Sequence, residues 1–90
     1  MQVKYIAARK VILQMNYDLK LGIYKHFKGN KYRVLGKAEN TETREIMVIY
    51  MALYGDFKIY VRPYEMFMSQ TDKEKYPDSD QKLRFEWILD

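Results

Sequence analysis

The chain has 90 residues, of which 48% are hydrophobic and 16% aromatic, and its formal net charge is +4. This length allows one domain with one small core, because two cores would each bury too little apolar surface. Cysteine is absent, which excludes a disulfide framework and a thiolate metal site. No apolar run approaches the length that spans a bilayer, and the N-terminus lacks a signal-peptide pattern. We therefore expect a cytoplasmic protein that stays out of the membrane and carries no metal or other cofactor.

Positive charge is concentrated in one part of the sequence. Six basic residues and no acidic residue occur between positions 20 and 37, whereas positions 69–80 hold more acidic than basic residues. A basic strip raises the local concentration of anionic partners such as phosphates or nucleic acids. The alternative is that these lysines serve only solubility.

The first nineteen residues are separated from the rest by their pattern. Apolar residues occupy most odd positions from Val3 to Leu19, with Arg9 as an interruption, which favours a strand. The lack of Gly and Pro also permits a helix. We expect an N-terminal extension over 1–19 and a domain over 20–90. Residues 1–14 lie before the region of family resemblance described below, so they are either an added element or foreign to the domain.

Alternating apolar residues between turn signals predict five strands, over 21–27, 31–39, 44–53, 57–62 and 82–89. The segments 28–30 and 54–56 contain Gly beside Asn or Asp, which favours tight turns and hence two hairpins. Pro63 ends the fourth strand because it cannot donate a hydrogen bond to a ladder. A helical turn is expected over 64–68 and a loop over 69–80. Together these elements predict a mainly β fold, a small Src-homology-3-like five-stranded barrel with a short helical turn before the last strand.

The third predicted strand is apolar on both faces. Ile46, Val48 and Tyr50 alternate with a second set that consists of Met47, Ile49 and Met51. A barrel buries only the inner face, so the N-terminal segment or another chain has to cover the other one. We expect either the chain's own extension or a homo-oligomer that forms through this second set.

Four spaced motifs resemble a known family. They are Gly-x-Tyr-x-His-Phe-Lys-Gly at 22–29, Thr-Glu-Thr at 41–43 with Leu-Tyr-Gly at 53–55, Tyr-Val-Arg-Pro at 60–63 with Met-Phe at 66–67, and Arg-Phe at 84–85. In this order they are similar to the domain of unknown function 1653 family of small bacterial and phage proteins, over about residues 20–88. The chain departs from the family where Asn40 replaces a frequent His and where the loop 69–80 is longer and more acidic. The resemblance implies a fold and candidate positions but no activity.

Catalytic and metal-binding groups are scarce. His26 is the single histidine, and one imidazole without cysteine argues against a transition-metal site. As a general base it would depend on Glu42 to orient its ring. Its alternative role is that of a hydrogen-bonded residue in the barrel wall. Arg62 is suited to hold a phosphate or carboxylate, or to pair with Glu42.

Tyrosines interleaved with basic residues are the remaining pattern. Such residues stack a base and hold its phosphate, although aromatic residues at every second position also build cores. The expected ligand-binding residues are Tyr24, His26, Lys28, Tyr32, Thr41, Glu42, Thr43, Tyr50, Tyr54 and Arg62. Thr41 and Thr43 have a turn-capping role as an alternative.

We interpret the chain as a non-catalytic binding module for a phosphate-bearing aromatic ligand. This anionic partner is either a nucleotide-type small molecule, held by sequestration, or nucleic acid. The second interpretation is a protein–protein interaction adaptor that uses the apolar face of the third strand. The third is a hydrolase that uses His26 and Glu42. Salt dependence separates the first two, because added salt weakens phosphate binding steeply and leaves an apolar interface intact.

Overall fold

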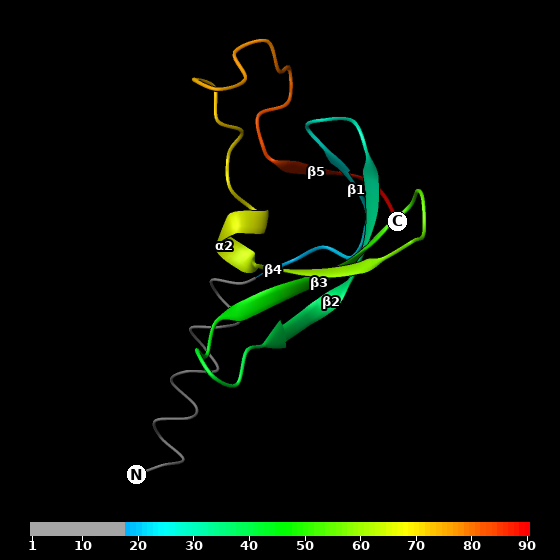
Figure 1. Ribbon diagram of the computed structural model, residues 1–90, viewed down its shortest axis with the longest axis vertical. Coiled ribbons are helices and arrows are strands. Elements are labelled where there is room, and N and C mark those ends of the chain that lie inside the picture. The colour runs from blue at the N-terminus through cyan, green and yellow to red at the C-terminus, as the bar shows by residue number, and fades with distance from the viewer. Residues whose placement is uncertain (1–17) are drawn as a thin grey trace.

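The computed structural model describes residues 18–90. It contains five strands and one short helix, which are β1 (Gly22–His26), β2 (Lys31–Glu39), β3 (Ile46–Ala52), β4 (Ile59–Pro63), α2 (Tyr64–Phe67) and β5 (Phe85–Leu89). The strands form a single antiparallel sheet in the order β4-β3-β2-β1-β5. Figure 1 shows this sheet strongly curved, with α2 and the segment that follows it lying on the concave side.

The mainly β class, the five strands and the helical turn after β4 are confirmed, but the sheet is not closed into a barrel. In the strand order, β4 and β5 are the two edges, and neither pairs with the other. The physical reason lies in α2, because its Phe67 ring stacks on Phe85 of β5 with a centroid separation of 4.1 Å. A side chain thus fills the place where a closing ladder between the edges would run. The predicted N-terminal strand falls on residues 1–17, outside the described part of the chain.

The core lies on the concave face of the sheet, which we call the inner face. Phe67, Phe85 and Val48 are fully buried there. The rings of Tyr24 and Tyr50 meet Phe67 edge-on, at 5.5 and 5.3 Å between centroids. Edge-to-face contacts of this kind add to the stabilisation from area burial alone. Two of the four tyrosines expected to bind a ligand, Tyr24 and Tyr50, are therefore core residues.

The convex face of the sheet, which we call the outer face, is aliphatic. Because side chains alternate along a strand, Met47, Ile49 and Met51 of β3 point away from the buried Val48 and Tyr50. Their partners on β4 are Pro63, Val61 and Ile59 respectively. Val61 is 60% exposed and Ile59 is 61% exposed. The second apolar face that the sequence predicts is therefore present on the sheet.

A glycine fixes the contact between β1 and β5. Gly22 has a φ of +129°, and a Cβ atom there would lie 2.5 Å from the Leu89 carbonyl oxygen and 2.8 Å from the Trp87 side chain. No other residue fits such a close approach. This contact lets β5 pair closely with β1, where His26 lies opposite Phe85 in the register. The family motif's first glycine thereby helps to place the histidine.

Candidate anion-binding site

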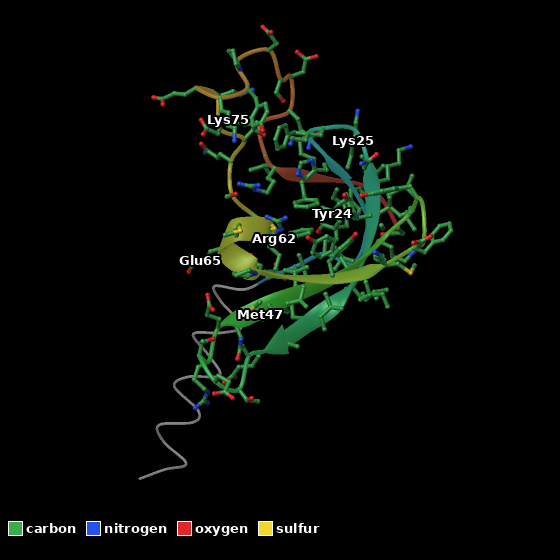
Figure 2. The ribbon with its side chains drawn as sticks, viewed as in Figure 1. Tyr24, Lys25, Met47, Arg62, Glu65 and Lys75 are labelled. Carbon is green, nitrogen blue, oxygen red and sulfur yellow. The ribbon has the colours of Figure 1, made fainter. Side chains whose placement is uncertain are left out.

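A cavity of about 300 Å³ opens beside the turn between β1 and β2. Three separate parts of the chain meet there: the end of β1 with its turn, the end of β4, and the segment 69–84. The lining residues are His26, Phe27, Lys28, Arg62, Asp72, Lys75, Tyr76 and Arg84. We call this site the cationic cavity, because four of its side chains are Lys or Arg and one is acidic. Figure 2 shows Arg62 near the helix and Lys75 above it on the long segment.

His26 lies at the end of β1 and is held in a defined orientation. Its Nδ1 accepts a hydrogen bond of 3.1 Å from the backbone N–H of Lys28, and its ring packs edge-on against Phe85 at 4.8 Å. Burial, together with the nearby charges of Arg84, Arg62 and Lys28, lowers the pKa of His26 from 6.5 to about 4. The imidazole is therefore neutral near pH 7. Since Nδ1 is the acceptor, Nε2 carries the proton and acts as a donor.

Arg62 reaches the cavity from the inner face of β4. Its Nε donates a 3.1 Å hydrogen bond to the Tyr50 hydroxyl, and its guanidinium carbon lies 5.9 Å from the Phe85 ring centroid. Tyr50 in turn is buried in the core. Within residues 18–90 no carboxylate forms an ion pair with Arg62. The core thus fixes the guanidinium through Nε and leaves its terminal nitrogens for another acceptor.

Arg84 lies directly before β5 and is held by contacts with Ser69 and Phe27. Its backbone N–H donates to the Ser69 carbonyl at 2.8 Å, and its own carbonyl accepts from Phe27 N–H at 3.0 Å. The side-chain Nε donates to Ser69 Oγ at 3.1 Å. These bonds tie the long segment 69–84 to the β1–β2 turn, so that Arg84 and His26 face the same cavity.

Two lysines complete the positive charge. The ammonium groups of Lys28 and Lys75 lie 5.4 and 5.7 Å from the Tyr76 ring centroid, and Tyr76 itself packs against Phe27 at 4.8 Å. The one acid of the lining, Asp72, uses Oδ1 to accept from the backbone N–H groups of Glu74 and Lys75. The Asp72 carboxylate therefore stabilises the turn over residues 72–75.

The arrangement presents donors and positive charge to whatever enters the cavity. Planar guanidinium groups bind phosphate or carboxylate oxygens through two parallel hydrogen bonds. Nothing in residues 18–90 forms a group of three or more His, Cys, Asp or Glu side chains that could hold a metal. The lining contains no serine, threonine or cysteine beside the histidine. A lining of this composition is suited to an anion.

Of the ten residues predicted from the sequence, His26, Lys28 and Arg62 line the cationic cavity. Tyr24 and Tyr50 are in the core instead. Tyr32 and Tyr54 share a hydrogen bond of 2.9 Å between their hydroxyls. Burial and this bond raise the pKa of Tyr32 to about 12.

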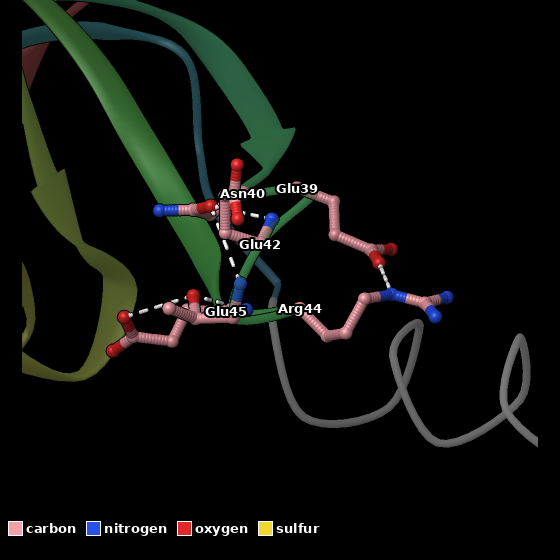
Figure 3. Close-up of polar contacts among 6 residues, drawn as sticks. Glu39, Asn40, Glu42, Arg44 and Glu45 are labelled. Atoms are coloured by element: carbon pink, nitrogen blue, oxygen red, sulfur yellow. Dashed lines mark hydrogen bonds and ion pairs between the residues drawn. The ribbon is translucent and has the colours of Figure 1, made fainter.

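Thr41, Glu42 and Thr43 lie in the turn between β2 and β3, where polar contacts hold the chain (Figure 3). Asn40 Oδ1 accepts from the Glu42 N–H at 2.9 Å, and the Thr43 hydroxyl accepts from Glu45 N–H at 3.2 Å. These residues are absent from the cavity lining. Among residues 18–90, no hydrogen bond or ion pair joins Glu42 to Arg62 or to His26, so neither expected pairing occurs.

Sequence reasoning missed Arg84, Lys75, Tyr76, Phe27 and Asp72 as site residues. The sequence predicts Arg84 within the last strand and Lys75 within an acidic loop, and neither position indicates a binding site. The available clue was the pair Lys75–Tyr76, a basic residue beside an aromatic one. Its position across from Phe27 is a property of the fold alone.

Comparison with known proteins places the chain in a family. The model of the family described as "Protein of unknown function (DUF1653)" matches residues 22–87. The chain belongs to this family. A crystal structure of a family protein from Bordetella bronchiseptica has a similar fold, with a TM-score of 0.68 and 28% sequence identity. The match covers 80% of this chain and 90% of the Bordetella chain. No curated protein matches significantly.

Within residues 18–90, no helix has the length and apolar character that crossing a membrane requires. The family's printed description gives no activity. The function is therefore argued from the cationic cavity itself.

Proposed function

We propose that this protein is a non-catalytic binding module that recognises a phosphate-bearing aromatic ligand. The observation that carries this proposal is the convergence of Arg62, Arg84, Lys28 and Lys75 on one cavity with a neutral histidine between them. Positive charge gathered in a cleft attracts anions, and it does so more strongly than the net charge of the chain implies. Phe27 and Tyr76 supply aromatic rings at the rim.

Binding without turnover fits the groups at the site. A general base needs an abstractable proton within hydrogen-bond reach, and the lining offers His26 no neighbouring hydroxyl or thiol nucleophile. The lowered pKa of His26 also makes it a weak base. Because Glu42 is absent from the cavity lining, His26 lacks the second residue that the hydrolase interpretation requires. Holding a nucleotide without cleaving it would amount to sequestration.

An interaction role is the second candidate, and the outer face favours it. Leu35, Ile59 and Val61 are exposed at 44, 61 and 60% beside Met47, Ile49 and Met51. Exposed aliphatic patches of this kind on soluble proteins mark interaction surfaces. A second copy of this chain is the partner we propose for this face, and it leaves the cationic cavity on the opposite side free.

The direct test is calorimetric titration of the protein with inorganic phosphate, thymidine and thymidine 5′-monophosphate. We expect thymidine 5′-monophosphate to bind more tightly than inorganic phosphate or thymidine alone. We also expect its affinity to fall steeply as the salt concentration is raised. The same mixtures are then analysed for hydrolysis products. Failure of thymidine monophosphate and phosphate to bind at low salt would overturn the proposal. Formation of products would overturn its non-catalytic part.

A further inference from the structure

A row of side chains leads from the cationic cavity along the edge of the sheet. Tyr60 and Arg62 of β4 lie opposite Tyr50 and Val48 of β3, which places both on the inner face. The Lys58 carbonyl accepts from Ala52 N–H at 2.9 Å, so Lys58 continues the same alternation. We call Lys58, Tyr60 and Arg62 the β4 row. Among the described strands β4 pairs with β3 alone, so the row lies at an edge of the sheet.

The members of the row differ in what holds them. Arg62 is anchored to the Tyr50 hydroxyl at 3.1 Å. The Tyr60 ring packs on Tyr50 at 5.8 Å and is still 40% exposed. Lys58 is exposed, and no ion pair involves it within the described residues. A basic, an aromatic and a second basic side chain are thus presented in order on one surface.

The spacing of the row suits a polymer better than a single nucleotide. Lys58 and Arg62 are four residues apart and therefore about 13 Å apart along the strand axis, a distance that two successive phosphate-to-phosphate steps of an extended single strand can cover. Grooves that bind single strands without sequence preference combine positive charge along the backbone with aromatic rings on which bases stack. The row provides both, and its Arg62 end opens into the cationic cavity.

We propose that the ligand of the cationic cavity is a single-stranded nucleic acid, whose backbone follows the β4 row from Lys58 to Arg62 and ends with a phosphate among Arg62, Arg84 and His26. This inference rests on the proposed function and narrows it from phosphate-bearing aromatic ligands in general. Tyr60 stacks one base between the two basic residues. Tyr54, exposed at 42% and bonded to Tyr32, lies at the turn that precedes β4 and offers the next ring.

The test compares oligothymidylates of one, two, four and eight nucleotides, with fluorescence anisotropy at several salt concentrations. We expect affinity to rise from one to four nucleotides as the row is occupied. Lys58→Ala then lowers the affinity for the tetranucleotide and reduces the salt slope by about 0.7, the value for one phosphate contact on a single strand. Tyr60→Ala lowers the affinity for the tetranucleotide roughly tenfold, because one base loses its stacking partner. Neither variant changes the binding of thymidine monophosphate.

One control variant and three contrary outcomes make the result decisive. Lys82→Ala, an exposed lysine outside the row and the cavity lining, is expected to leave tetranucleotide affinity unchanged. Tight binding of thymidine monophosphate without any gain from longer strands would overturn this inference and leave the proposed function intact. Equal affinity for a duplex of the same length would overturn it too. Absence of binding by every one of these ligands would instead overturn the proposed function.

Discussion

The two faces of one sheet differ in chemistry although the same strands build them. The inner face of β3 and β4 carries Val48, Tyr50, Tyr60 and Arg62, and it joins an aromatic core to the cationic cavity. The outer face of the same strands is aliphatic and open. Strand alternation makes this division possible, because neighbouring residues point to opposite sides. The short strand β4 thus contributes Arg62 to the lining of the cationic cavity on one face and exposes Ile59 and Val61 on the other.

The largest expected effect comes from the inner face. Phe67→Ala removes a fully buried ring that stacks on Phe85 and meets Tyr24 and Tyr50. Truncating a buried aromatic costs about 3–5 kcal/mol, which is a large part of the stability of a small domain. We expect the urea concentration at the unfolding midpoint to fall sharply, or the protein to be unfolded in buffer without urea. Phe57→Ala, at a 56% exposed ring, is the control and is expected to change little.

The outer face is tested with the double variant Met47→Glu and Met51→Glu. If a second copy covers this face, two buried carboxylates in each copy prevent association. We expect native mass spectrometry to show a dimer or larger assembly for the wild type and a folded monomer for the variant. A wild-type monomer at micromolar concentration would refute the homo-oligomer.

A smaller effect is expected from a conservative change at Arg62, on the inner face. Arg62→Lys keeps the charge of the cationic cavity and loses the planar fork, so we expect affinity for thymidine monophosphate to fall about tenfold. The matched control is Arg33→Lys on β2, opposite Met51 and away from the cavity lining. It is expected to leave affinity unchanged. An Arg62→Lys variant with wild-type affinity and wild-type melting temperature would remove Arg62 from the site.

The smallest expected effect is a pH dependence of folding. The pKa of His26 is lowered from 6.5 to about 4 in the folded protein, so between these values the unfolded chain binds a proton that the folded chain does not. Stability from this residue is therefore present above pH 6.5 and is lost as pH falls toward 4. We expect His26→Gln to lose less stability than the wild type between pH 7 and 4.5, measured by urea unfolding. Equal losses would contradict the lowered pKa.

The strand pattern was predictable because its determinants are local. The predicted strand 31–39 matches β2, and 21–27 and 44–53 exceed β1 and β3 by one or two residues at each end. The last strand begins at Phe85 instead of position 82, because the residues before it serve other contacts. Leu83 forms an isolated bridge with Gln70, and its N–H donates to the Glu86 carboxylate.

The candidate site was predictable only in part. His26, Lys28 and Arg62 stood out through motif and charge, and all three line the cationic cavity. Glu42 stood out as well, yet it lies in the β2–β3 turn and is absent from the cavity lining. Arg84 belongs to the Arg-Phe motif at 84–85, but the motif by itself indicates no binding role. Its role follows from two backbone hydrogen bonds, to Ser69 and from Phe27.

The sequence by itself determined the strands, the turns, the third strand with its two apolar faces, and the family. The reason is that periodicity and turn chemistry are properties of neighbouring residues. Only the tertiary structure decided that the sheet stays open and that the cavity is cationic. Phe67 fills the gap between β4 and β5, and the segment 69–84 folds back to bring Lys75 and Arg84 beside His26. Both outcomes depend on contacts between residues far apart in the chain, whose packing energies no local pattern encodes.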